Sequence, residues 1–423
     1  MFLKPRFLRG FFLLVLAPRV HLVLQRGKKH LEKGLHMRWY DAYDEETKMI
    51  VDSVRSFCKR DATPVYKTHE AFGRFPDLLI PKMAELGLFG LTIPEEYGGL
   101  GQSTLVSSLV ARELAYCWGA LHLIWTANCS LAAFPIMFAG TEEQKRRFLP
   151  QLASGEILGC YALTEPNAGS DVAGMSVRAR KKKDSWILHG SKIFITNAWH
   201  AQVAIVFAKT GDGEHDISAF IVESKEEGLI LPGITVRKIP KRVQKSSDFC
   251  EITFDDVVLS EHALLGERNQ GFKIAMTTLD RGRINIAAQA VGIAASVWDG
   301  AFEYVTKTRS QFGRRVWRNQ AIQFQFAMAW SRLQAAWAMI EKTSLLADAG
   351  VPITQFASAT KLFASETADD VAHNIVKKFG GMAVTEELEW FARANDVFPT
   401  TIYEGTSDIQ HIVLARELEK GNT

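Results

Sequence analysis

The chain has 423 residues, of which 47% are hydrophobic and 23% are charged. This composition is typical of a globular protein with two or three domains, and it excludes a disordered chain, a collagen and a disulfide-stabilised miniprotein. The formal net charge of +3 is concentrated at one end, because residues 1–36 carry eight basic groups and one acidic group. The remaining 42 basic and 46 acidic residues leave no broad basic surface for nucleic acid.

Residues 1–36 form a basic tail with an apolar stretch at 11–24, which Pro18 and Arg19 interrupt. A membrane-spanning helix needs about 20 mostly apolar residues, so we expect no membrane span here. A secretory signal is opposed by the unpaired cysteines. A mitochondrial presequence fits the charge but not the lack of serine. We favour initiation at Met37 and a bacterial cytoplasmic protein, with the mitochondrial matrix as the alternative.

Residues 37–160 are predicted to form an N-terminal helical domain. Ile50, Val54 and Phe57 keep helical spacing behind an acidic start. Thr141 and Gln144 have the spacing of a capping box, in which each side chain satisfies a free amide of the first helical turn.

Residues 161–268 change to a period of two. Alternating segments at 186–188, 203–207, 219–221, 234–236 and 252–254 are separated by turn-rich stretches. Short strands at this spacing predict a middle domain built as an antiparallel β-barrel or sandwich.

Residues 269–423 return to helical patterns, with runs near 270–306, 318–349 and 354–379 and a last run from 406. These runs predict a C-terminal four-helix bundle. The fold class is therefore α+β and multidomain. The five cysteines contain no C-x-x-C pair and the histidines show no paired ligand spacing, so we expect neither a disulfide framework nor a metal site.

Two motifs lie in and beside the predicted sheet. Residues 161–171, YALTEPNAGSD, lie where helix gives way to strand, and their hydroxyls and amides suit an anionic or heteroaromatic ligand. The alternative is a structural connector. Residues 191–197, SKIFITN, alternate as a strand that could equally be plain core.

Three further motifs lie between the predicted C-terminal helices. Residues 309–313, RSQFG, place an arginine beside an aromatic ring, and residues 379–381, FGG, allow close backbone approach to a ligand. Both patterns also occur as ordinary helix ends. Residues 402–410, IYEGTSDIQ, place a carboxylate just before a helix start, as a functional group or as a capping glutamate.

Other chemistries are poorly supported by the sequence. Gly98-Gly99-Leu100-Gly101 lacks the strand and helix that flank a nicotinamide-binding loop, and no Ser/His/Asp order stands out.

The order of the five motifs within a helix–sheet–helix pattern resembles the acyl-CoA dehydrogenase family, over roughly residues 40–420. Residues 93–99, IPEEYGG, fit the same family. Residues 279–284, LDRGRI, are most similar to its short-chain branch. The resemblance implies the acyl-CoA dehydrogenase fold, an FAD cofactor, a homotetramer and electron transfer to an electron-transfer flavoprotein.

The resemblance also implies roles for individual residues. Glu404 matches the general base, and the substrate-binding positions are Ser170, Asp280 and Arg283. Residues near the flavin ring and ribityl chain would be Tyr161, Leu163, Thr164, Gly169, Ser170, Phe194 and Thr196. Residues that reach the dinucleotide of a neighbouring subunit would be Arg309, Gln311, Phe312, Asn319, Gln320, Lys377, Gly380 and Gly381. Thr406 and Asp408 would close the site.

This chemistry is α,β-dehydrogenation of an acyl-CoA thioester. Glu404 would abstract the α-proton, and flavin N5 would accept the β-hydride, since no amino acid accepts hydride. The alternatives are an acyl-CoA oxidase, a non-redox lyase on the same fold, or a flavin-binding scaffold with little activity.

The sequence departs from the family pattern at the dinucleotide edge. Lys377 stands where relatives often have glutamine, and Met382 follows the paired glycines. Asn395 replaces an expected arginine nine residues before Glu404. Residues 322–330 lack the usual lysine and aspartate.

Overall fold

A computed structural model of the chain describes residues 39–226 and 228–421. The predicted basic tail, residues 1–36, lies outside them. The chain divides after Ser53 into two compact units, Met1–Ser53 and Val54–Thr423. In the described part of the first unit, the Asp44 carboxylate accepts a hydrogen bond from the Thr47 amide at 2.8 Å and caps helix α2 (Glu45–Phe57).

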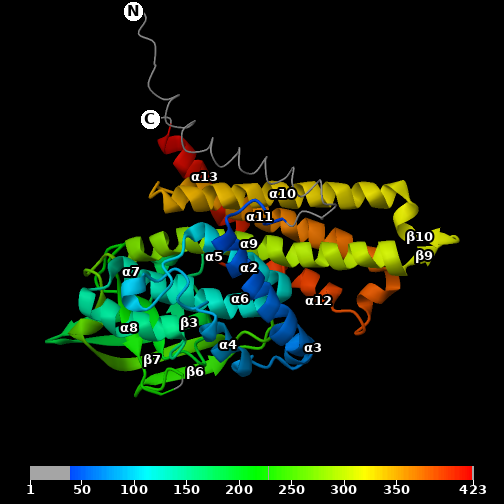
Figure 1. Cartoon of the computed structure of the whole chain (residues 1–423). Coiled ribbons are helices and arrows are strands. Elements are labelled where there is room, and N and C mark those ends of the chain that lie inside the picture. The colour runs from blue at the N-terminus through cyan, green and yellow to red at the C-terminus, as the bar shows by residue number, and fades with distance from the viewer. Residues whose placement is uncertain (1–38, 227, 422–423) are drawn as a thin grey trace, which may run out of the picture. The chain divides into compact units, whose positions relative to one another are not determined.

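The second unit begins with a layer of helices (Figure 1). Its α-helices are α3 (Thr63–Phe72), α4 (Ile80–Glu85), α5 (Thr104–Cys117), α6 (Gly119–Thr126), α7 (Phe134–Ala139) and α8 (Glu142–Ser154). The predicted capping box is present at the start of α8, where Thr141 and Gln144 exchange hydrogen bonds. The free end of the Gln144 amide donates to the carbonyls of His262 and Leu264, both at 2.9 Å. The cap thus also joins α8 to the sheet.

One segment of this layer, Gly119–Ala139, is apolar and long enough to cross a membrane. It consists of α6, a π-helical turn at Ala127–Ala133 and α7. Within the described chain, 72% of its apolar window is buried inside the protein. Its apolar composition is therefore accounted for by its place in the core.

The middle of the chain forms one eight-stranded sheet. Its strands are β1 (Gly159–Ala162), β2 (Arg178–Lys182), β3 (Ser185–Thr196), β4 (Val203–Lys209), β5 (Ile217–Glu223), β6 (Ile234–Lys238), β7 (Phe249–Ser260) and β8 (Leu264–Leu265). The order is β6-β7-β3-β2-β4-β5-β8, and β1 pairs with β4. Neighbours are mostly antiparallel, but the β1–β4 and β2–β4 ladders are parallel.

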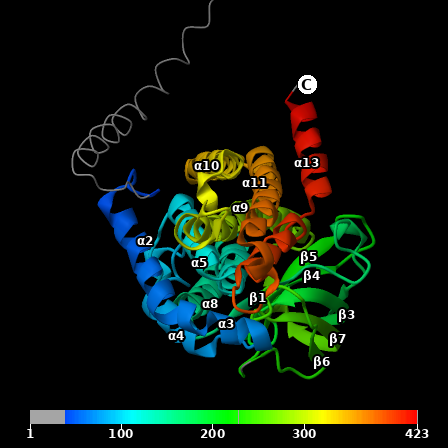
Figure 2. The same ribbon diagram turned by 90° about the vertical axis from the view of Figure 1, so that its right-hand side faces the viewer.

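Strand β4 is buried on both faces, which explains its unbroken apolar sequence. Ile205 and Phe207 belong to a core that also contains Phe148 of α8. Val206 belongs to a second core together with Trp186 of β3. Figure 2 shows the sheet beside the helices of the same unit.

The C-terminal part is helical again and follows the predicted runs closely. Its α-helices are α9 (Gly271–Glu303), α10 (Gln320–Asp348), α11 (Thr354–Ile375), α12 (Trp390–Asn395) and α13 (Ser407–Lys420). Helix α9 packs against α5, α10 and α11, and α13 packs against α11. Small residues allow this closeness, since a Cβ at Gly292 would lie 2.4 Å from the Arg112 carbonyl oxygen of α5.

Two irregular segments interrupt the bundle. A short hairpin, β9 (Ser310–Gln311) and β10 (Arg314–Arg315), links α9 to α10 and lies at the end of this helix pair in Figure 1. The run predicted as helix to residue 379 leaves the α-helical path at Ile375 and continues as 3-10 turns through Val384. Gly380 breaks those turns with φ 66°.

Candidate functional site

Glu404 lies in the short turn between the 3-10 segment Phe398–Thr401 and α13. Its φ is 53°, and that of Gly405 is 96°. A non-glycine residue in the left-handed region is uncommon and is often found at functional sites. The turn ends at Thr406, whose hydroxyl accepts a hydrogen bond from the Ile409 amide at 3.3 Å and caps α13. Asp408 is exposed in the first turn of that helix.

The Glu404 carboxylate lies directly against the backbone of α9 at Gly282. A Cβ at position 282 would lie 2.2 Å from Glu404 Oε2 and 2.7 Å from its carboxyl carbon. Only glycine therefore leaves room for the carboxylate at this place. The contact brings together two positions that are far apart in the sequence.

The Glu404 carboxylate is shielded from solvent. Both of its oxygens are buried, and they accept no hydrogen bond from the residues that the structure describes. Burial raises the pKa of Glu404 to about 8, although the positive charges of Arg283 and Lys361 act in the opposite direction. The ionised form of a carboxyl group with this pKa is a stronger base than an ordinary glutamate.

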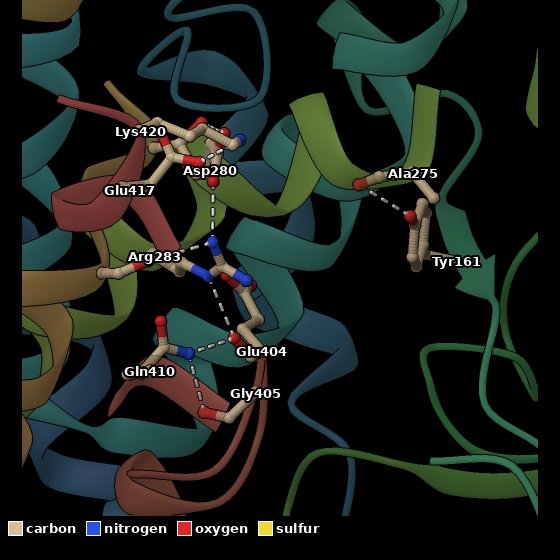
Figure 3. Close-up of polar contacts among 11 residues, drawn as sticks. Tyr161, Ala275, Asp280, Arg283, Glu404, Gly405, Gln410, Glu417 and Lys420 are labelled. Atoms are coloured by element: carbon tan, nitrogen blue, oxygen red, sulfur yellow. Dashed lines mark hydrogen bonds and ion pairs between the residues drawn. The ribbon is translucent and has the colours of Figure 1, made fainter. Parts of the chain in front are cut away.

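The backbone of the Glu404 turn is held by side chains from three helices. Gln410 of α13 donates its amide to the carbonyls of Glu404 and Gly405, both at 3.0 Å (Figure 3). Arg283 Nε of α9 donates to the Glu404 carbonyl at 3.4 Å. Lys361 Nζ of α11 donates to the Gly405 carbonyl at 2.8 Å. The backbone oxygens are thus anchored while the carboxylate is left free.

Arg283 and Asp280, predicted together as substrate-binding residues, form an ion pair on α9. Arg283 is 4% exposed and donates from Nη1 to Asp280 Oδ1 at 2.7 Å (Figure 3). Asp280 Oδ2 accepts a hydrogen bond from the Thr354 hydroxyl at 2.6 Å. Burial raises the pKa of Asp280. The pair therefore orients Arg283 beside the base, while Ser170, the third predicted substrate residue, is exposed on the loop after β1.

The YALTEPNAGSD loop, residues 161–171, begins in β1 and is fixed by a buried ion pair. Lys192 Nζ lies 2.8 Å from both the Leu163 carbonyl and Glu165 Oε1. Glu165 also accepts hydrogen bonds from the amides of Ser176 and Val177. These bonds set the path of the loop.

The remaining predicted residues of this loop differ in their exposure. Tyr161 is buried and donates to the Ala275 carbonyl of α9 at 3.5 Å (Figure 3). Leu163 is buried, Thr164 is half-buried and Gly169 is exposed. The loop thus runs from the core near α9 to the surface.

Strand β3 ends irregularly at Phe194 and Thr196. The register between β3 and β7 shifts between Lys192 and Ile195, and Phe194 has φ 65°. The Phe194 ring is 50% exposed and stacks on Phe249, with ring centroids 5.0 Å apart. This bulge leaves the Phe194 ring exposed near the end of β3.

Comparison with known proteins matches three domain models in chain order. They are the N-terminal domain of acyl-CoA dehydrogenase at residues 44–156, the middle domain at 160–257 and the C-terminal domain at 269–419. The short-chain specific acyl-CoA dehydrogenase of Bos taurus mitochondria is 38% identical over 89% of this chain and 90% of its own length. This chain belongs to the acyl-CoA dehydrogenase family.

Solved structures of the family have the same fold. Butyryl-CoA dehydrogenase from Megasphaera elsdenii has a TM-score of 0.86 and 36% identity, over 90% of this chain and 100% of its own. A chain from a study of the electron transferring flavoprotein of Acidaminococcus fermentans also has a TM-score of 0.86, with 37% identity over 90% and 99%. A glutaryl-CoA dehydrogenase from Mycobacterium smegmatis in complex with FADH2 has a TM-score of 0.83, with 29% identity over 89% and 95%. The predicted family and fold class are confirmed.

The residues that the family resemblance assigns to the flavin ring fit a flat heteroaromatic group. Phe194 exposes half of an aromatic ring that such a group would cover. Thr164 and Thr196 belong to the same two motifs as these residues. Both are half-buried and carry hydroxyl groups. Lys192 fixes the Leu163 carbonyl, so the adjoining peptide has a defined orientation before any ligand binds.

The residues that the resemblance assigns to the dinucleotide of a neighbouring subunit lie around the C-terminal end of α9. Arg309 Nη1 donates to the Lys378 carbonyl at 2.6 Å, and a Cβ at Gly380 would lie 2.6 Å from its Nη2. Phe312 at the hairpin tip is 96% exposed. The other members of the set, all on the surface or partly exposed, are Gln311, Asn319, Gln320, Lys377 and Gly381.

This second set lies far from Glu404 within one chain. Gly282, which contacts Glu404, is separated from Glu303 at the end of α9 by about 30 Å of helix at 1.5 Å per residue. Arg309 follows that end. The Glu404 turn and the Arg309 set are therefore two separate groups within one chain.

Three residues near the base were not singled out by the sequence analysis. Lys361 and Gln410 hold the Glu404 turn, and Gln289 of α9 accepts a hydrogen bond from the Tyr403 hydroxyl at 2.8 Å. The sequence does contain a signal for Lys361, because the lysine interrupts a series of small residues whose helical spacing predicts that they face the core. Gln289 lies on the small-residue stretch of α9 and left a similar signal.

Proposed function

We propose that this acyl-CoA dehydrogenase acts on short-chain acyl-CoA thioesters, with Glu404 as the general base and an electron-transfer flavoprotein as the electron acceptor. The observation that carries the proposal is the buried Glu404 carboxylate, which lies against Gly282 with no hydrogen-bond partner among the described residues. A carboxyl group with a purely structural role would be hydrogen-bonded, because a buried polar group without a partner costs about 1–3 kcal/mol. An unpaired carboxylate of raised pKa is suited to proton abstraction.

Proton removal from Cα leaves negative charge on the thioester oxygen, which needs a hydrogen-bond donor. The Glu404 amide donates to no backbone carbonyl among the described residues. Its carbonyl is held on the other side by Gln410 and Arg283. The Glu404 amide is therefore suited to bind the developing oxyanion, a contact that contributes about 3 kcal/mol in other enzymes.

The cofactor of the reaction is FAD, which supplies the two-electron acceptor that no side chain provides. The YALTEPNAGSD loop and Phe194 with Thr196 would hold its ring, and Thr406 and Asp408 would border the site. Glu404 takes the α-proton on its carboxylate. Arg283 holds the backbone of the Glu404 turn in place.

Substrate length and electron acceptor are supported by the relatives. Among them are a short-chain specific enzyme and a butyryl-CoA dehydrogenase, and one structure comes from work on an electron transferring flavoprotein. Trp125 is fully buried and donates to the Leu88 carbonyl at 2.8 Å. Its ring is a core group, so the length preference does not rest on it.

The two separate groups of cofactor residues support a homo-oligomer, in which the Arg309 end of one copy completes the site of another. Exposed apolar side chains on α10, Phe324 at 63% and Met328 at 64%, fit burial between copies. A homotetramer is the form we propose. Light scattering of the active enzyme tests it, and an active monomer would contradict it.

The proposed reaction is tested by anaerobic titration of the purified yellow protein with a series of acyl-CoAs. We expect the flavin absorbance to bleach with butyryl-CoA and to bleach less with long-chain thioesters. Reoxidation by an electron-transfer flavoprotein should be faster than by oxygen, which separates a dehydrogenase from an oxidase. A protein that binds FAD but is bleached by no acyl-CoA would overturn the proposal.

A further inference from the structure

Lys361 is a buried cation beside the base that the proposed reaction does not use. It lies in the middle of α11 and is 0% exposed. Its ammonium donates to the Gly405 carbonyl at 2.8 Å. One turn earlier on the same helix, Ser358 accepts a hydrogen bond from Arg283 at 3.3 Å. Helix α11 thus contacts both the base turn and the arginine that borders it.

This lysine is costly for the fold. An ammonium has three donors, and among the described residues Lys361 makes one hydrogen bond. Burial lowers the pKa of Lys361 to about 8. An apolar side chain of similar size would avoid this desolvation cost. A charge retained at such a place is better explained by function than by stability.

The position of the ammonium indicates what it does. Gly405 and Glu404 both have positive φ, so the turn depends on contacts that hold its carbonyls. Lys361 holds one of these carbonyls, and Gln410 contacts both. The Lys361 charge also acts on the Glu404 carboxylate through space, favouring the ionised form.

The other groups that face this pair come from several elements. Arg283 of α9 also favours ionised Glu404. Tyr161 of β1 and Tyr403 interact with the Glu404 charge, and burial raises the pKa of each phenol, so both stay neutral. Glu366 of α11 acts on Lys361. Lys361 and Arg283 are therefore the two cations that set the basicity of Glu404.

We propose that Lys361 is a positioning residue for the general base: it fixes the Gly405 carbonyl of the left-handed turn and favours the ionised form of Glu404. The proposal rests on the role proposed for Glu404. It assigns to α11 a part in catalysis without contact to the substrate.

The first test compares Lys361→Met and Lys361→Gln with wild type in the flavin-loaded enzyme. Both variants remove the charge, and Gln keeps a neutral donor for the Gly405 carbonyl. We expect the midpoint of the pH profile of flavin reduction to move upward by about one unit in both. The reduction rate at neutral pH should fall by about tenfold in the Met variant and by less in the Gln variant. Melting temperatures should stay equal or rise.

Lys342→Met is the matched control, because Lys342 lies on the neighbouring helix α10 over the Phe356 ring of α11 but is exposed. Its pH profile should match wild type. An unchanged midpoint in the folded Lys361 variants, or an equal shift in Lys342→Met, would overturn the proposal. If Lys361→Met does not fold, Lys361→Gln decides by the same midpoint.

A second readout does not depend on turnover. Infrared difference spectra between each protein and its Glu404→Gln counterpart report the protonation of Glu404 in the absence of substrate. We expect Glu404 to titrate at higher pH in the Lys361 variants than in wild type. If no acyl-CoA reduces the wild-type flavin, the proposed function fails, while this titration still supports or refutes the influence of Lys361 on Glu404.

Discussion

Two glycines mark two differently built regions of this molecule. At Gly282, a missing side chain makes room for the Glu404 carboxylate, which is enclosed within one chain and left without a hydrogen bond from the described residues. At Gly380, a missing side chain makes room for the Arg309 guanidinium, which is bound to the Lys378 carbonyl beside a hairpin with an almost fully exposed Phe312. The first region is enclosed by residues of a single chain, whereas the second is exposed, as expected if it contacts another copy in the homo-oligomer proposed above. Disrupting the first should change chemistry, and disrupting the second should change cofactor retention and assembly.

The largest effect is expected at the base. Glu404→Gln keeps the size of the side chain but removes the proton acceptor, so turnover should fall by about 10²–10⁴-fold. FAD content and oligomeric state should stay as in wild type, because the Arg309 region is untouched. The measurement is the rate of flavin reduction by the best acyl-CoA, and a near-normal rate would remove Glu404 from the mechanism.

Gly282→Ala should have the next largest effect. Its Cβ would overlap the carboxylate, so Glu404 must move, and a displacement near 1 Å can cost about 10²-fold in rate. The measurement is again flavin reduction, with FAD content as the control. A normal rate would show that the close contact with Gly282 is not needed.

A double variant that moves the carboxylate from the Glu404 turn onto α9 tests whether the two positions face the same place. Glu404→Gly empties the space that Gly282 faces, and adding Gly282→Glu places a carboxylate there from the other side. We expect the double variant to recover part of the activity that Glu404→Gly loses. Double-variant activity no higher than that of Glu404→Gly, with FAD and fold retained, would argue against a shared position of the two side chains.

Arg309→Ala should weaken FAD retention by about tenfold, the loss expected for one or two charge-assisted hydrogen bonds. Flavin bound per chain after dilution and gel filtration measures this loss.

Lys377→Ala tests whether this lysine has replaced the usual glutamine as a phosphate contact. Its amine bonds only the Asn374 side chain among the described residues, so a smaller loss is expected. Unchanged retention in both variants would erase the contrast between the two regions.

The smallest effect concerns stability and pH. The pKa of Glu404 is raised from 4.5 to about 8 in the folded protein, so folding favours its protonated form. This contribution is present below pH 4.5 and is lost as the pH rises through about 8. Glu404→Gln cannot ionise and should lose less stability than wild type across that window. Asp396, whose pKa is also raised to about 8, keeps part of the dependence in both proteins. Urea midpoints at the two ends of the window measure the difference, and parallel curves would contradict it.

Local patterns predicted most of the fold, because α9, α10, α11 and α13 and the longer strands each repeat apolar residues at their own period. Strand β2, with the sequence RARKK, and the parallel partner β1 lack such a signal, since their pairing depends on neighbours distant in sequence. The family and fold class were confirmed by the comparisons, and the roles of the individual site residues stay predictions.

The site was only partly predictable for the same physical reason. The position of Glu404 just before a helix start left a functional group and a capping glutamate open, and the family resemblance assigned it as the general base. The Gly282 contact and the Lys361 hydrogen bond depend on how α9 and α11 pack around that turn. No local pattern in the sequence encodes such packing.

The capping box of α8 has a consequence for how the second unit unfolds. The side-chain oxygen of Gln144 caps the start of α8, and its nitrogen donates to the carbonyls of His262 and Leu264 where β8 begins. Fraying of the first turn of α8 therefore also releases the edge of the sheet. Helix α8 and the β8 edge of the sheet are therefore expected to unfold together.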